Sequence, residues 1–189
     1  MAAVMRNLAL RRPVTLKGER VTLRTARTAD QGALERLRAD PEIDYFMGVD
    51  SSPANVLWRH VYLGDQSGAL VDLAIIGTQD QPIGLVSLWD RTIPHQAAEL
   101  SIWVGEGYRN GGSGTEALQL TLGYAFGELK LHKIYLRVLE YNTRAIRTYE
   151  KVGFRVEGVL RDEMKVNGRW HALVYMGLLT HEYAVGSSQ

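Results

Sequence analysis

A glycine-rich segment near the middle of the chain constrains the fold more than any other feature. The run GYRNGGSG, residues 107–114, contains four glycines and separates a β-like stretch at 97–105 from a helix-like stretch at 115–127. Glycine adopts left-handed backbone readily and lets the chain approach another group closely. Successive N–H groups at the start of a helix form an anion site, into which the positive end of the helix dipole points. The pattern predicts a strand–loop–helix unit that binds an anion such as pyrophosphate, with a ligand-free flexible turn as the alternative.

Two familiar phosphate-binding motifs do not fit this loop. A P-loop ends in Gly-Lys-Ser or Gly-Lys-Thr, whereas this segment continues as Gly114-Thr115-Glu116. The dinucleotide fingerprint G-x-G-x-x-G does not match either, because the glycines here are spaced G-x-x-x-G-G-x-G. The pattern that does fit is R-x-x-G-x-G, formed by Arg109, Gly112 and Gly114.

The order of the predicted elements indicates a mixed α/β domain. Strands are predicted where β-forming or alternating residues cluster, at 19–26, 69–77, 82–90, 97–105 and 132–140. Helices are predicted where capping residues precede a helical periodicity, at 28–40, 52–64, 115–127 and 143–152. A final hairpin of strands 156–166 and 169–179 turns at Asn167-Gly168, a strong hairpin signal. Consecutive strands before the glycine loop favour antiparallel pairing over a purely parallel sheet.

Length and charge set the broad class of the protein. The 189 residues suit one domain, predicted over residues 16–182 after a flexible N-terminal arm at 1–15. The formal net charge of +1 gives no case for a nucleic-acid partner or a polybasic membrane anchor. No apolar run approaches the roughly 20 residues that span a membrane, and the start lacks the apolar core of a signal peptide. The expected location is therefore the cytoplasm.

The residue types that bind metals or form acyl intermediates are scarce. The chain has no cysteine, which excludes disulfides, thiolate metal ligands and a cysteine nucleophile. No metal is expected, because the histidines show no metal-ligand spacing. They are His60, His95, His132, His171 and His181.

Together, two segments resemble the GNAT family of acetyl-CoA-dependent N-acetyltransferases. Residues 103–118, WVGEGYRNGGSGTEAL, resemble the acetyl-CoA pyrophosphate loop of the family. Residues 142–154, NTRAIRTYEKVGF, resemble its second signature, a helix with a tyrosine that ends in Gly-Phe. The resemblance extends over about residues 16–180. It implies a central mixed, mostly antiparallel sheet flanked by helices, with a V-shaped splay between the fourth and fifth strands.

Three further segments are similar to the branch that contains RimJ and RimL, which acetylate the N-termini of ribosomal proteins. These segments are LKGERVTLR at 16–24, AELSIWV at 98–104 and EGVLRDEMKVNGRW at 157–170. The similarity implies acetyl-CoA as co-substrate and a protein N-terminal amine as the first choice of acceptor.

The resemblance also implies a set of CoA contacts. Trp103 and Val104 would offer main-chain hydrogen bonds to the pantetheine arm, and an N–H near Val104 would face the thioester oxygen. Arg109 either makes a charge-assisted contact with CoA or braces the loop, and Asn142 caps its helix, touches the pantetheine, or does both. The pyrophosphate would be bound by backbone N–H groups of Asn110, Gly111, Gly112, Gly114 and Thr115.

Two side chains are candidates for proton transfer. Glu99 lies on the strand before the loop, where some GNAT enzymes carry a catalytic glutamate, and is the candidate base for the attacking amine. Its alternative is an exposed glutamate of an ordinary strand. Tyr149 is the candidate acid for the leaving thiolate, and its alternative is a core tyrosine. With no cysteine, direct acetyl transfer to the amine is expected.

The identity of the acceptor stays open between two classes of amine. After a protein N-terminus, the runner-up is a polyamine, an aminoglycoside or an amino acid, and a non-catalytic acyl-CoA-binding module is the alternative from another functional class. A strongly cationic acceptor would require several carboxylates around the pocket, and a homodimer is compatible with the chain. The candidate carboxylates are Asp44, Asp50, Asp90 and Glu163.

Overall fold

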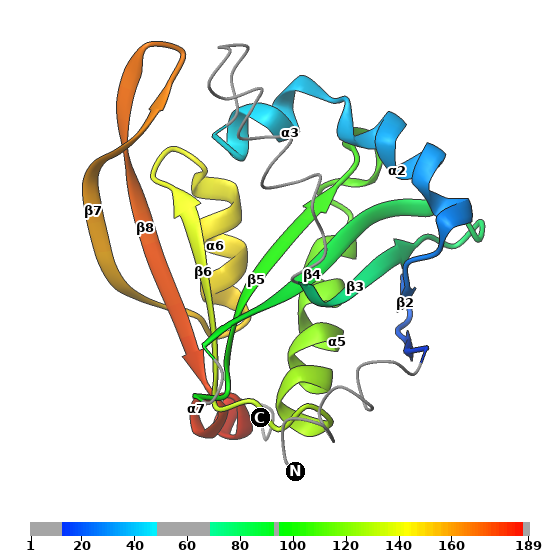
Figure 1. Cartoon of the computed structure of the whole chain (residues 1–189). Helices are drawn as coiled ribbons and strands as arrows, with labels where there is room; N and C mark the ends of the chain where they lie inside the picture. Colours follow the sequence, from blue (N-terminus) through cyan, green and yellow to red (C-terminus); the bar gives the residue numbers. More distant parts are fainter. Residues whose placement is uncertain (1–12, 49–68, 93–94, 187–189) are drawn as a thin grey trace.

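One eight-stranded sheet runs through the part of the chain that the computed structural model describes, residues 13–48, 69–92 and 95–186 (Figure 1). The strand order is β1-β2-β3-β4-β5-β6-β8-β7, and only the β5–β6 pair is parallel among these strands. The predicted mixed, mostly antiparallel sheet is therefore confirmed. The strands are β1 (Thr15–Lys17), β2 (Thr22–Thr25), β3 (Ala69–Ile76), β4 (Pro82–Thr92), β5 (Ala97–Val104), β6 (Lys133–Leu139), β7 (Arg155–Val166) and β8 (Arg169–Leu179).

The helices flank this sheet, and α5, the longest in the described ranges, anchors the core. Helix α5 packs against β5, β2 and β4, while α2 packs against β4. One apolar face of α5 is buried, and each fully buried leucine on it contributes about 2 kcal/mol. Its residues are Leu118, Leu122, Ala125 and Phe126. The helices are η1 (Thr28–Asp30), α2 (Gln31–Arg38), α3 (Pro41–Phe46), η3 (Glu106–Tyr108), α5 (Ser113–Gly127), α6 (Thr143–Lys151) and α7 (Thr180–Gly186).

Local signals placed the β7–β8 hairpin and helix α6 correctly. Asn167 and Gly168 have φ angles of 49° and 79°, the left-handed backbone that a two-residue hairpin turn requires. Asn142 caps α6, since its side chain accepts a hydrogen bond from the Ala145 N–H at 3.2 Å. Gly153 follows the end of α6 with a φ of 104°, as a residue after a helix C-cap often does.

Short elements escaped the sequence patterns. Pro41 follows the helix predicted at 28–40 and starts a new one, α3, because proline suits the first turn and Asp40 accepts the Glu42 N–H at 2.9 Å. Strand β1 begins at Thr15, within the segment assigned to the N-terminal arm, and α7 was not predicted. The helix predicted at 52–64 lies outside the described residues.

The residue before α2 does not cap this helix through its side chain. The helix begins at Gln31, and the Asp30 side chain makes no cap hydrogen bond to it. Instead the Asp30 carboxylate accepts the Arg27 N–H at 2.8 Å and pairs with Arg24 at 2.7 Å. The hydrogen bonds from Arg24 lower the pKa of Asp30 against the effect of burial.

Candidate active site

A cleft opens where β5 and β6 part. The two strands pair only from Ala97↔Lys133 to Glu99↔Tyr135, and beyond that register they diverge (Figure 1). The cleft has a volume of about 620 Å³. Among the residues predicted for the site, all except Gly111 line this cleft.

The open edge of β5 offers main-chain hydrogen bonds to a ligand. The Gly105 N–H donates a hydrogen bond to the carbonyl of Ile83, a residue of β4, at 2.9 Å. The direction in which backbone groups point alternates from residue to residue along a strand. The backbone groups of Val104 and Ile102 therefore point away from β4, toward the cleft. By the same alternation, the backbone of Trp103, which is paired with Leu85, points toward β4. This register favours Val104 over Trp103 as the main-chain donor.

The glycine loop adopts the backbone that its sequence predicts. Gly112 is the N-cap of α5 and has a φ of 88°, and Asn110 has a φ of 64°. A side chain at Gly111 would meet no atom within 4 Å, so the outer surface of the loop is open. Thr115 follows in the first turn of α5, where the helix N–H groups lack intrahelical partners. These N–H groups form the kind of helix start that binds anions.

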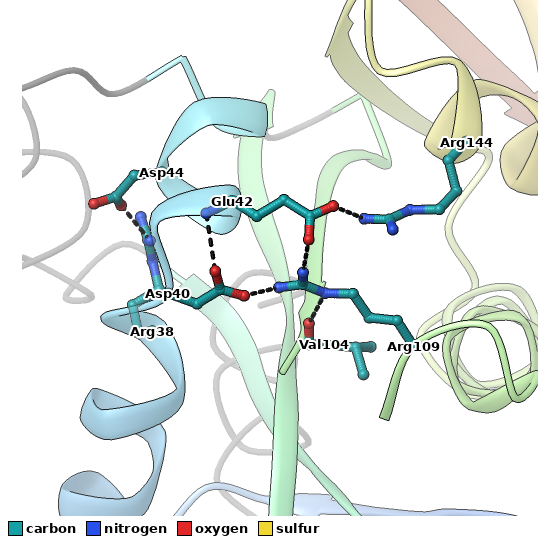
Figure 2. Close-up of polar contacts among 7 residues, drawn as sticks. All are labelled: Arg38, Asp40, Glu42, Asp44, Val104, Arg109 and Arg144. Atoms are coloured by element: carbon teal, nitrogen blue, oxygen red, sulfur yellow. Dashed lines mark hydrogen bonds and ion pairs between the residues drawn. The ribbon is translucent and has the colours of Figure 1, made fainter. Parts of the chain in front are cut away.

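Arg109 braces the loop against β5 and α3. Its Nε donates to the Val104 carbonyl at 2.8 Å, and its two terminal nitrogens bind the carboxylates of Asp40 and Glu42 (Figure 2). The Arg109 side chain is only 10% exposed. Of the two predicted roles of Arg109, these contacts favour the brace.

Helix α3 lines the cleft and is tied both to the glycine loop and to the start of α6. The second carboxylate oxygen of Glu42 accepts a hydrogen bond from Arg144 of α6 at 2.9 Å, so Glu42 bridges α6 and the loop (Figure 2). Tyr45 of α3 stacks on Tyr141 with ring centroids 4.6 Å apart, and the Tyr141 hydroxyl donates to the Tyr45 carbonyl at 2.7 Å. Sequence patterns did not identify this network, because its members come from separate elements.

Glu99 lies at the point where β5 and β6 separate. It is 7% exposed, and its Oε1 accepts a hydrogen bond from Arg137 of β6 at 2.7 Å. The alternative of an exposed strand glutamate is therefore wrong. The pairing gives Glu99 two candidate roles, as a base for the acceptor amine and as the residue that holds Arg137 beside the cleft.

Tyr149 enters the cleft wall from α6. It is 9% exposed and packs edge-on against Phe154, with ring centroids 5.9 Å apart. Burial raises the pKa of Tyr149 to about 12. The phenol is therefore protonated at neutral pH, the state in which it can donate a proton or a hydrogen bond.

The carboxylates considered for a cationic acceptor do not gather at the cleft within the described residues. Asp44 pairs with Arg38 at 2.5 Å, and Glu163 lies on the exposed strand β7. Neither lines the cleft. Asp50 and the side chain of Asp90 lie outside the described part. Among the described residues, no three His, Cys, Asp or Glu side chains group as a metal site would require, and no helix is long and apolar enough to cross a membrane.

Glu116 is a structural residue of the site that the sequence marked only as a mismatch to the P-loop motif. Its carboxylate accepts hydrogen bonds from the N–H groups of Glu19, Arg20 and Val21, each at 2.8 Å. Burial raises the pKa of the Glu116 carboxyl, but these donors outweigh it and the net shift is downward. Glu116 thus fastens the turn before β2 to the first turn of α5. A carboxylate at a helix start was the available signal, but the sequence did not indicate its partner.

Comparison with known proteins agrees with this geometry. Spermidine N(1)-acetyltransferase of Escherichia coli (strain K12) is 35% identical over 109 residues, and the match spans 58% of this chain and only 59% of that protein. A putative ribosomal N-acetyltransferase of Bacillus subtilis (strain 168), YdaF, is 31% identical over 129 residues, 67% of each protein.

A solved structure shares the fold over nearly its whole length. The spermidine N-acetyltransferase of Vibrio cholerae, in a crystal structure with CoA and spermine, superposes with a TM-score of 0.74 at 27% identity. The match covers 88% of this chain and 99% of that one. A family profile described as the acetyltransferase (GNAT) domain matches residues 20–155. The chain therefore belongs to the GNAT acetyltransferase family.

Proposed function

We propose that this protein transfers an acetyl group from acetyl-CoA directly to the primary amine of a small polyamine-like molecule. The observation that carries the proposal is that three features meet at one cleft. They are the splay between β5 and β6, the left-handed Gly112 at the start of α5, and the buried side chain of Tyr149. The family match supports the reaction, and the similarity to spermidine acetyltransferases supports the acceptor class. In place of the carboxylates considered from the sequence, the described carboxylates that line the cleft are Glu42 and Glu99.

The residues of the loop fit the diphosphate end of CoA. Backbone N–H groups of Asn110, Gly111, Gly112, Gly114 and Thr115 surround the start of α5, where the helix dipole favours an anion. The pantetheine arm would lie along the open edge of β5, with Val104 as its main-chain partner. Asn142 at the start of α6 lines the other side of the same cleft.

Proton movements can be assigned to two side chains. In the reaction, the amine nitrogen forms a bond to the acetyl carbon and the carbon–sulfur bond breaks. The Val104 N–H would stabilise the negative charge that develops on the carbonyl oxygen. Tyr149 would give its proton, or a hydrogen bond, to the departing sulfur, and Glu99 or a water would take the proton that the amine loses.

The acceptor preference revises the sequence-based expectation. The RimJ and RimL resemblance placed a protein N-terminus first, whereas the similarity to polyamine acetyltransferases favours the alternative. The similarity to YdaF keeps a ribosomal protein N-terminus as the second candidate.

The test is a thiol-release assay with acetyl-CoA across a panel of amines: spermidine, spermine, free amino acids, an aminoglycoside and a peptide with a free N-terminus. We expect release to be fastest with a polyamine, with kcat/KM at least about tenfold above that for the peptide, a difference of about 1.4 kcal/mol in transition-state binding. A preference for the peptide would overturn the polyamine assignment. CoA binding without release for any amine would instead identify an acyl-CoA-binding module.

A further inference from the structure

The charge of the CoA diphosphate has no evident side-chain partner in the loop itself. The one arginine of the loop, Arg109, directs its guanidinium to the Val104 carbonyl and to Asp40 and Glu42 (Figure 2). The loop would therefore meet a diphosphate with backbone N–H groups alone. An arginine within reach would strengthen such a site, because hydrogen bonds between charged groups are shorter and roughly twice as strong as neutral ones.

A second arginine lies beside the loop. A Cβ added at Gly112 would be 3.4 Å from Nε and 3.5 Å from Cδ of Arg20, so the Arg20 side chain runs directly past this glycine. Arg20 is exposed, and it forms no ion pair with any other residue in the described ranges. In its lack of an ion pair Arg20 differs from Arg109, whose charge is neutralised by the carboxylates of Asp40 and Glu42.

The backbone of Arg20 is fixed where the side chain can serve the loop. The carboxylate of Glu116 on α5 accepts hydrogen bonds from the backbone N–H groups of Glu19, Arg20 and Val21, each at 2.8 Å. The turn before β2 is thereby docked on the same first helical turn that follows Gly112. Against the effect of burial, these three donors and, to a smaller extent, the positive charge of Arg20 hold the pKa of Glu116 below its ordinary value.

We propose that Arg20 is a CoA-binding residue that contacts the diphosphate through its guanidinium. The inference rests on the proposed function, since it takes CoA as the ligand of the loop. It adds to the loop a residue that lies outside both sequence signatures and outside the lining of the cleft, beside Gly112, and so assigns one neutralising charge to the N-terminal part of the sheet. Glu116 acts on the ligand only through Arg20 and is a positioning residue.

The test compares CoA binding of the full chain and of Arg20→Gln by calorimetry at low and moderate salt. We expect Arg20→Gln to weaken CoA about tenfold at low salt, as loss of one charge-assisted contact predicts, and less at higher salt because the lost term is screened. Arg20→Lys, which keeps the charge without the planar fork, should lose less. Arg169→Gln is the control, since Arg169 is likewise an exposed arginine but begins β8, at the opposite end of the sheet from β2.

Three outcomes separate this inference from the proposed function. Dephospho-CoA, which lacks the 3′-phosphate, should show the same fold-loss on Arg20→Gln as CoA. A loss confined to CoA would place Arg20 at the 3′-phosphate and overturn the diphosphate assignment. Equal affinity of the unchanged chain and Arg20→Gln would overturn the inference and leave the function standing, whereas no CoA binding by the unchanged chain would overturn the function itself.

Discussion

The two walls of the cleft are held in place by different forces. The loop wall, made of β5, residues 105–112 and α5, is joined to the sheet by strand pairing and to the core by the buried face of α5. The α3 wall, Pro41–Phe46, is attached through the side chains of Glu42, Tyr45 and its neighbour Asp40. Substitutions in the loop wall should therefore alter the geometry of cofactor binding. Substitutions in the α3 wall should have modest effects on activity, and these effects should depend on the salt concentration.

The largest effect should come from the loop wall. Gly112→Val places a β-branched residue at a φ of 88° and brings it against Arg20, so we expect CoA affinity to fall by at least about 100-fold while the fold is kept. Titration of CoA by calorimetry and thermal unfolding measure the two effects. Gly107→Ala is the control, because a Cβ at Gly107 meets nothing within 4 Å and should leave affinity unchanged. An unchanged CoA affinity in Gly112→Val would contradict the assignment of the loop as a CoA-binding site.

The next effect separates chemistry from binding on the opposite side of the cleft. Tyr149→Phe removes one hydroxyl and little packing, so we expect kcat to fall about 100-fold, the lower end for a general acid, with the KM for acetyl-CoA kept. Because the pKa of Tyr149 is raised to about 12, the phenol stays protonated as pH rises, and the wild-type rate should lose no acid function below about pH 10.

The matched control for this variant is Tyr124→Phe. Tyr124 is also buried, on α5, but does not line the cleft. Equal losses of kcat in the two variants would mean that Tyr149 acts through packing and not as an acid.

A smaller effect should distinguish the two roles of Glu99. If Glu99 is the base, Glu99→Gln should lower kcat/KM about tenfold at neutral pH, and the loss should shrink as pH rises, since the free amine then needs no base. The measurement is the pH dependence of kcat/KM for Glu99→Gln and for Arg137→Gln. A loss of the same size at every pH, shared by Arg137→Gln, would assign Glu99 to holding Arg137 at the separation of the strands.

The smallest effect is expected at the α3 wall. Glu42→Gln removes the charge that links Arg109 to Arg144, so we expect kcat/KM to fall about two- to fivefold at low salt, and by less at high salt because partly exposed pairs are screened. Glu150→Gln on α6, an exposed glutamate that does not line the cleft, is the control. An effect that does not depend on salt would show that the α3 wall is held by its aromatic contacts instead.

The sequence alone determined the features whose cause is local. The glycine spacing, the Asn142 cap and the Asn167-Gly168 turn each specify backbone conformations from a few neighbouring residues, and the structure has all three. The alternation and periodicity of apolar residues gave the mixed sheet and the buried face of α5. Short elements were lost because a six-residue helix such as α3 carries too few positions for a period to appear, and Pro41 is compatible with both an end and a start.

Only the tertiary structure decided which charges meet. Arg109 finds Glu42 and Asp40 at separations of 67 and 69 residues, and Glu116 finds the backbone of Arg20 across 96. An ion pair depends on where the fold brings two side chains, and many pairings of opposite charge are compatible with one sequence. The same holds for Glu99, whose partner Arg137 is set by the short parallel register of β5 and β6. The sequence could identify Arg109 and Glu99 as candidate site residues, but the packing of elements distant in the chain decides which side chains they pair with.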